Sequence, residues 1–328
     1  MERMESFRMT GMRKMDLSLE RIKRAAQEMD PVFRDSPQFF DEELCQALGK
    51  RVLVKVETAN PLRSFKGRGA GFFVGGLEAK KHLVCASAGN FGQAMAHAGR
   101  SRGMKVDVFA AEDANPMKVK RMESFGARVV LRGASFDEAK EAAKEFAAQG
   151  SDRLFIEDGD EPAIAEGAGT IGMELMKEGK FDAVVVPLGD GALITGIALW
   201  VKEFAPQSKL IGVCPSGAPA MLDSWKAGRA LSTAKAETIA DGISVRVPVA
   251  SSVERLVALV DDIVLVDDVE MVDAMRFAVK TLGIVLEPAG AAGLAAIRKG
   301  AVAGERLATI LTGGNIRPEM LHELLAES

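Results

Sequence analysis

Residues 64–70 read Ser-Phe-Lys-Gly-Arg-Gly-Ala and follow a short β-branched run, Val52–Val56, and a loop that contains Pro61. The proline and the glycines that bracket Lys66 are typical of a turn that leads into a helix. A lysine in a loop is ordinarily solvated surface. If it is buried, desolvation favours its neutral form, and a neutral amine is what bond formation to a carbonyl group requires. The stretch therefore makes Lys66 a candidate for covalent catalysis.

Apolar runs alternate with longer helical stretches along the rest of the chain. The runs show little polar alternation, which is typical of strands covered on both faces: Val52–Val56, Leu83–Ser87, Val106–Ala110, Arg128–Leu131, Leu154–Ile156, Ala183–Pro187, Leu210–Cys214 and Ile263–Val266. The helical stretches between them include Phe91–Arg102, Pro116–Phe125, Phe136–Ala148 and Ala163–Lys177. This alternation predicts an α/β fold with a mostly parallel sheet. Ligands of such sheets bind beyond the carboxyl ends of the strands, so the strand-to-helix loops are the places to search.

Composition limits the chemistry. The 328 residues carry a formal net charge of −4, with three His, three Cys and no Tyr. The slight acidity gives no electrostatic footprint for nucleic acid. Few histidines leave little for metal or His-based catalysis, so we expect a cofactor to supply the reactive chemistry.

The same composition bears on location. Three widely spaced cysteines argue against a disulfide framework and indicate a reducing compartment. There is no apolar run of about 20 residues for a membrane span, and the first residues have no apolar core for a signal peptide. We expect a cytoplasmic protein that does not bind membranes, with residues 1–16 forming a flexible arm.

Three further strand-to-helix loops stand out. Residues 87–93, Ser-Ala-Gly-Asn-Phe-Gly-Gln, open a helix whose small first residues suit a carboxylate, although an ordinary helix N-cap explains them equally. Residues 187–193, Pro-Leu-Gly-Asp-Gly-Ala-Leu, have the spaced glycines of an anion nest, or of a tight turn. Residues 309–315, Thr-Ile-Leu-Thr-Gly-Gly-Asn, end the last apolar run and could offer the hydroxyl of Thr312 to a ring nitrogen.

Familiar nucleotide and metal motifs are absent. Residues 189–194 end in Ile194 where the dinucleotide fingerprint requires Gly or Ala. No His-Glu-x-x-His or Cys-x-x-Cys pattern occurs, and no Gly-x-Ser-x-Gly nucleophile elbow. We predict no metal site.

Taken together, in this order and at these separations, the four loops resemble the fold-type II pyridoxal-phosphate enzymes, specifically the serine/threonine dehydratase (threonine ammonia-lyase) and serine racemase family. The likeness begins near Ile22 and includes residues 165–174, 238–243 and 287–292. It implies a two-domain α/β fold like that of the tryptophan synthase β chain, with mostly parallel open sheets flanked by helices. A large cofactor-binding domain would comprise residues 1–80 and 160–328, and a small inserted α/β domain residues 81–159. A homodimer is the family expectation.

The resemblance also assigns roles. Lys66 would bond to pyridoxal 5'-phosphate and act as the base at the substrate Cα, Asn90 would bind the cofactor's 3-hydroxyl, and Thr312 its ring nitrogen. The remaining cofactor-binding residues would be Phe65 and Glu287, with the backbone of Gly189, Asp190, Gly191, Ala192 and Leu193 around the phosphate. The residues expected to line the substrate are Ser64, Ser87, Ala88, Gly89 and Phe91.

The implied reaction is an ammonia-lyase reaction, the dehydration and deamination of a β-hydroxy amino acid such as L-threonine or L-serine to a 2-oxo acid and ammonia. An amino-acid racemase, a threonine or cysteine synthase-like β-replacement enzyme and a non-catalytic binding protein are the alternatives. Racemases of this group carry a second serine where this chain has Ala88, which favours elimination. Phe91 replaces the family's usual His and makes the substrate wall less polar. Asp190 interrupts the glycines of the phosphate loop, and we expect its carboxyl to point away from the phosphate.

Overall fold

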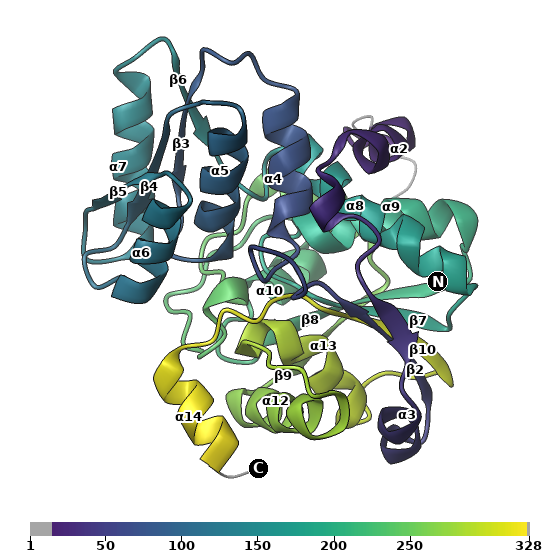
Figure 1. The fold of residues 1–328 in the computed structure, drawn as a ribbon. Helices are drawn as coiled ribbons and strands as arrows, with labels where there is room; N and C mark the ends of the chain where they lie inside the picture. The colour runs from purple at the N-terminus through teal and green to yellow at the C-terminus, as the bar shows by residue number, and fades with distance from the viewer. Residues whose placement is uncertain (1–14, 327–328) are drawn as a thin grey trace.

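The computed structural model describes residues 15–326, which form two sheets with helices packed on their faces (Figure 1). Residues 1–14, most of the predicted flexible arm, lie outside the described residues. The larger sheet has the order β1-β2-β10-β7-β8-β9. Its strands are β1 (Gln38–Phe40), β2 (Arg51–Val56), β7 (Ala183–Pro187), β8 (Lys209–Pro215), β9 (Asp262–Val266) and β10 (Arg306–Leu311).

The larger sheet is covered on both faces, which explains its near-continuous apolar strands. Strand β1 pairs antiparallel with β2, and the other neighbours pair in parallel. Successive residues of a strand face opposite sides, so Val185 of β7 joins one core and Val184 and Val186 join the other. The first core lies under α12 (Asp268–Leu282) and α13 (Pro288–Arg298), and the second under α8 (Pro162–Leu175) and α9 (Ala192–Phe204).

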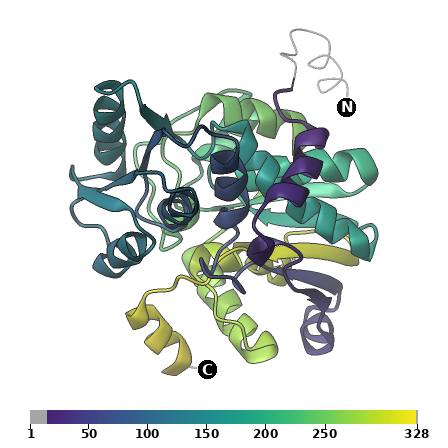
Figure 2. The same cartoon turned by 45° about the horizontal axis from the view of Figure 1, so that its top comes forward.

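The smaller sheet is parallel throughout, in the order β5-β4-β3-β6. Its strands are β3 (His82–Ala86), β4 (Val106–Ala110), β5 (Arg128–Leu131) and β6 (Arg153–Ile156). Val84 packs with α7 (Phe136–Ala148) on one face, and Leu83 packs with α5 (Asn90–Ser101) on the other. This sheet and its helices lie beside the larger sheet in both views (Figures 1 and 2). The division into two domains at residues 80 and 160 stays a prediction.

The predicted fold class is confirmed, and the predicted strands match within two residues at each end. The short edge strand β1 was not predicted, because three residues are too few to show a period. The other helices are α2 (Leu19–Glu28), α3 (Glu42–Leu48), α4 (Lys66–Gly75), α6 (Pro116–Ser124), α10 (Ala220–Ala227), α11 (Ala250–Leu259) and α14 (Pro318–Ala326), and the 3₁₀ helices are η1 (Pro31–Phe33), η2 (Met176–Glu178) and η3 (Asp241–Ile243).

A buried ion-pair network anchors helix α4. The side chain of Arg68 is fully buried, and its guanidinium donates to both oxygens of Glu57 and both oxygens of Glu174, at 2.7–2.9 Å. It also donates to Thr170 at 3.0 Å, and Lys55 pairs with Glu174 at 2.5 Å. Because two cations face two carboxylates and each Arg68 nitrogen donates a hydrogen bond, the desolvation cost of the buried charges is offset. The network fixes the first turn of α4 against β2 and α8.

Three further observations concern the cysteines, membrane-spanning helices and clusters of metal-binding side chains. Cys45, Cys85 and Cys214 are free thiols. Within residues 15–326 no helix is long and apolar enough to cross a membrane. In the same described part of the chain no three His, Cys, Asp or Glu side chains gather as a metal site would require.

Candidate active site

Lys66 is the first residue of α4 and follows directly on the loop that leaves β2. The loop is tied to the end of β10: the Phe65 N–H donates to the Thr312 carbonyl at 3.1 Å, and Ser64 bridges to Gly313. The Lys66 side chain is only 15% exposed. Its Nζ lies 4.7 Å from the ring centroid of Phe65 and 5.9 Å from that of Phe91. The amine is therefore largely buried and lies near two aromatic rings.

Asp158 is in direct contact with this amine, and the sequence reasoning missed it. The Lys66 Nζ pairs with Oδ2 of Asp158, which follows β6 and is 7% exposed. Strand β6 lies next to β3 in the smaller sheet, so its carboxyl end faces the same site as the loop after β3. The run Glu157–Glu161 reads as a solvated acidic loop, and only its position after a strand could have marked Asp158 as a site residue.

The start of α5 brings Asn90 into the site. Gly89 precedes the helix without a side-chain cap, so the first N–H groups of α5 point to a site that suits a carboxylate. The Asn90 amide donates to Glu287 Oε1 at 2.5 Å and accepts from the Asn315 amide at 2.7 Å. Phe91, at 7% exposure, packs in the core beneath. The loops after β3 and β10 and the start of α13 thus meet at Asn90.

Glu287 is buried at the start of α13, with 3% exposure. Burial raises the pKa of its carboxyl to about 7, and the negative charge of Asp241 adds to this, against smaller opposing effects of Lys118, Asn90 and Lys66. The N–H of Glu287 donates to the Gly313 carbonyl at 3.0 Å. A Cβ on Gly313 would lie 1.9 Å from Glu287 Oε1. Glycine is therefore required at residue 313 for the carboxyl to reach Asn90.

The predicted phosphate loop joins β7 to α9. Gly191 has φ of +92° and precedes α9 without a side-chain cap, so the first N–H groups of α9 remain for an anion. A Cβ on Gly191 would lie 2.3 Å from Ser252 Oγ, and one on Gly189 would lie 3.0 Å from the Gly242 carbonyl. Gly242 belongs to η3, within the motif at residues 238–243. Bare backbone and a helix N-terminus form a cradle of the kind that binds phosphate.

Asp190 is partly exposed, and the outward direction of its carboxyl stays a prediction. Burial raises its pKa to about 6, with an added contribution from the charge of Asp158. The positive charge of Lys66 acts in the opposite direction. The physical reason for the burial is local packing: residues 157–160 lie over the loop, and a Cβ on Gly159 would come within 2.8 Å of the Asp190 carbonyl.

The remaining predicted residues also gather here. Thr312, 5% exposed, donates to the Ala289 carbonyl at 3.4 Å. The Ser64 hydroxyl is buried and has no hydrogen-bond partner, which leaves it free for a ligand. Ser87 accepts from the Gly89 N–H at 3.1 Å, and Ala88 lies between them, partly exposed. The structure brings these residues together, and their individual roles stay predictions.

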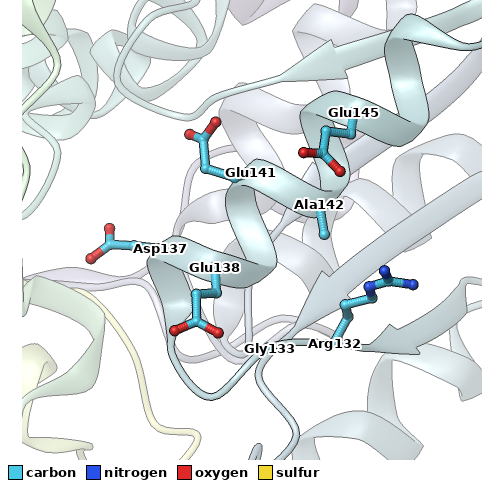
Figure 3. Close-up of a pocket in the computed structure, with 7 residues that line it drawn as sticks. All are labelled: Arg132, Gly133, Asp137, Glu138, Glu141, Ala142 and Glu145. Atoms are coloured by element: carbon cyan, nitrogen blue, oxygen red, sulfur yellow. The ribbon is translucent and has the colours of Figure 1, made fainter.

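Two hollows lie outside this cluster of loops. One, of about 820 Å³, is lined by α6, residues 238–241 and the start of α14, and the ion pair of Lys118 with Asp241 crosses it. It adjoins the site, since both charges act on Glu287. The other, of about 370 Å³, is lined by Arg132, Gly133 and carboxylates along α7 such as Glu141 (Figure 3). No predicted site residue lines this second hollow.

Comparison with known proteins gives a consistent result. Residues 31–313 match the family described as "Pyridoxal-phosphate dependent enzyme". The L-threonine ammonia-lyase of Thermotoga maritima is 34% identical over 94% of this chain and 78% of its own length. The biosynthetic L-threonine dehydratase of Escherichia coli is 34% identical over 84% of this chain but 55% of its own length. The solved threonine deaminase isoform 2 of Solanum lycopersicum superposes with a TM-score of 0.85 and 28% identity, over 96% of this chain and 95% of that one.

Proposed function

The chain belongs to the pyridoxal-phosphate dependent enzymes, and from that premise we propose that it is an ammonia-lyase acting on L-threonine or L-serine. The substrate class is that named for its relatives, threonine ammonia-lyase and threonine deaminase. The observation that carries the proposal is the position of the largely buried Lys66 amine, which lies 4.7 Å from the ring centroid of Phe65 and 5.9 Å from that of Phe91, in the first turn of α5.

The residues present fit pyridoxal phosphate. The loop of Gly189 and Gly191 would hold the phosphate, because α9 begins there without a side-chain cap and leaves its first N–H groups for an anion. Lys66 would bond to the aldehyde, and Asn90 and Thr312 offer an amide and a hydroxyl for the ring substituents. When bound, the cofactor withdraws electrons from the substrate Cα. The family prediction and the cofactor prediction made from the sequence are confirmed.

The protein's own groups would position the substrate and move its proton. The N-terminus of α5 suits the substrate carboxylate because its N–H groups carry partial positive charge. The buried Ser64 hydroxyl, which has no partner, is free to bind the same carboxylate. The Lys66 Nζ holds the proton taken from Cα. The rings of Phe65 and Phe91 exclude water from this amine.

Ala88 supports elimination over racemisation. A racemase needs a proton donor on each side of the substrate Cα, and the methyl group of Ala88 stands where relatives that racemise carry a hydroxyl. On the Lys66 side, the amine supplies one such group. With one side lacking a donor, an intermediate that has lost its Cα proton proceeds to loss of the β-hydroxyl.

A substrate assay tests the proposal. Purified protein loaded with pyridoxal phosphate is incubated with L-threonine, L-serine and their D-enantiomers, and 2-oxo acid and ammonia are measured together. We expect equal amounts of both products from an L-substrate and no racemised amino acid by chiral chromatography. Lys66→Ala should lose all activity, while Lys144→Ala on the exposed face of α7 should keep it. A cofactor-loaded protein that forms no 2-oxo acid from any of these substrates contradicts the proposal.

The same proposal covers assembly and location. The enzyme is a cytoplasmic homodimer without nucleic-acid partners, and residues 81–159 are its small domain. The free thiols support the location, and the slightly acidic net charge of −4 supports the absence of nucleic-acid partners. The homodimer and the small domain are what the resemblance to the family implies. Size-exclusion chromatography with light scattering should give twice the mass of one chain. A mass of one chain at micromolar concentration would contradict the dimer.

A further inference from the structure

Two acidic residues that the proposed reaction does not use lie close to one another, and one of them contacts the reactive lysine. Asp158 contacts the Lys66 Nζ directly through Oδ2. Asp190 stands in the predicted phosphate loop, where an acidic side chain would repel a phosphate. They come from different parts of the chain, the end of β6 and the end of β7. Their closeness calls for a physical account.

The two acids are held together by a close backbone contact. Gly159, next to Asp158, lies so near Asp190 that an added Cβ would be 2.8 Å from the Asp190 carbonyl oxygen and 3.0 Å from its Cβ. Ser252 from α11 donates to the same carbonyl oxygen and fixes the loop from the other side. Residue 159 must therefore be glycine for the end of β6 to lie on the phosphate loop.

Asp158 has one oxygen engaged and one free. Oδ2 pairs with Lys66, while Oδ1 is buried and has no hydrogen-bond partner. A buried carboxylate oxygen without a partner is destabilising, and more so when it is charged. Such an atom is tolerated when a ligand or a proton reaches it during function. Protonation of Asp158 on Oδ1 would remove the cost.

Burial and four charged groups act on Asp190. Asp158 and Glu157 after β6 favour its protonated form, as burial does, while Lys66 on α4 and Lys140 on α7 favour the ionised form. Glu157 pairs with Lys140, so their effects largely cancel. The electrostatic balance around Asp190 is therefore set by burial, Asp158 and Lys66.

We propose that Asp158 is a further catalytic residue, which takes the proton from the Lys66 ammonium. Asp190 is the second carboxyl of this pair, and it holds a proton at low pH and releases it as the pH rises. The transfer breaks one N–H bond at Nζ and forms one O–H bond at Asp158. An ammonium and a carboxylate become a neutral amine and a neutral acid, so net charge and electrons balance. Neutral groups suit a dry site better than ions.

This proposal depends on the cofactor and on no particular amino-acid substrate. Lys66 must become a neutral amine before it can bond to pyridoxal phosphate, so proton removal is testable in the absence of substrate. The measurement is the rate at which cofactor-free protein captures pyridoxal phosphate between pH 5 and 9, followed by the absorption band of the bound cofactor. Failure of this test and failure of the lyase assay are therefore distinguishable.

Asp158→Asn keeps the shape of the side chain and removes the base. We expect capture at pH 7 to become about 100-fold slower, the usual scale of general-base catalysis, and to rise with pH as hydroxide replaces the carboxylate. Asp158→Glu should restore part of the rate. If Asp158 merely held the lysine charged, its removal would make capture faster. A faster or unchanged rate in Asp158→Asn would overturn the proposal.

Asp160→Asn is the matched control. Asp160 lies two residues after Asp158, carries the same charge, and is an exposed side chain that accepts a hydrogen bond from Ser251. It should capture the cofactor at the wild-type rate. Asp190→Asn tests the second carboxyl even if Asp158→Asn does not fold. The wild-type rate should show a step near pH 6, where Asp190 ionises, and Asp190→Asn should lose that step. Persistence of the step would also overturn the proposal.

Discussion

The amide of Asn90 on α5 donates a 2.5 Å hydrogen bond to the carboxyl of Glu287, which precedes α13 and lies 197 residues further along the chain. This contact joins a helix of the smaller sheet to one of the larger sheet at the proposed cofactor site. The pKa of this buried carboxyl is raised to about 7. The state of this carboxyl therefore links pH to both stability and cofactor binding.

Glu287→Gln should flatten the pH dependence of stability. In the folded protein Glu287 binds a proton up to about pH 7, whereas a glutamate in the unfolded chain releases it near 4.5. The stabilisation is complete below pH 4.5 and is lost as the pH rises through 7, by up to about 3 kcal/mol. Urea unfolding of cofactor-free protein at pH 5 and 8 measures it.

In that experiment, Glu287→Gln should be the more stable protein at pH 8, because its amide has no proton to lose. Glu145→Gln, on the exposed face of α7, is the control and should follow the wild type. If the free energy of unfolding changes equally between pH 5 and 8 in the wild type and in Glu287→Gln, the buried carboxyl does not titrate as described.

Gly191→Ala should weaken cofactor binding. A Cβ there meets Ser252 Oγ at 2.3 Å, and the backbone has φ of +92°, so we expect a loss of about 1–3 kcal/mol in stability and a tenfold or greater rise in the Kd for pyridoxal phosphate. Gly71→Ala is the control, since no atom lies within 4 Å of its added Cβ. Replacing this helical glycine should stabilise the protein by about 0.5–1 kcal/mol. Cofactor titration and thermal unfolding measure the two effects.

Arg68→Met should destabilise the whole protein. The substitution leaves the carboxylates of Glu57 and Glu174 buried with one partner fewer, and breaking a buried pair costs about 3–5 kcal/mol. Lys23→Met removes an exposed pair with Glu20 and should cost less than about 1 kcal/mol. Urea unfolding at constant pH compares the free energies of unfolding of the two variants. Similar losses of this free energy would argue against the network as the anchor of α4.

Ala88→Ser should introduce a hydroxyl on the side of the site opposite Lys66. We expect D-serine that carries deuterium at Cα to form from L-serine in D₂O about tenfold faster than in the wild type, since a positioned acid or base commonly contributes at least that much. Chiral chromatography with mass spectrometry measures it. A rate of D-serine formation equal to that of the wild type would place Ala88 away from the reacting carbon.

Much of this architecture follows from local pattern. Strand β7 is apolar at every position, and β4 is apolar except at Asp107, because helices cover both faces of each sheet. The limits of these strands could therefore be predicted without knowledge of the sheet order. Lys66 could be identified because its flanking motif resembles that of a known family. Order within the sheets was not predictable, since it depends on contacts between distant segments.

Asp158 and Asp190 show where such reasoning stops. Asp158 lies in an acidic run that looks solvated, and nothing local reveals that Lys66 reaches it. The pKa of Asp190 is raised partly by Asp158, and its close neighbour Gly159 lies on the loop of another strand. The surroundings of a side chain at a strand end are set by adjacent loops, which the sequence of one loop does not describe.

The central place of β10 has a consequence for synthesis. Residues 306–311 lie between β2 and β7 in the larger sheet, so β2 leaves the ribosome long before a neighbour that is made about 250 residues later. Until that segment emerges, β2 and β7 expose unpaired edges, which are sites of aggregation, and Thr312 cannot reach the loop of Lys66. The nascent chain therefore cannot complete its cofactor site before translation passes β10, and chaperones that shield strand edges should determine the yield of folded enzyme.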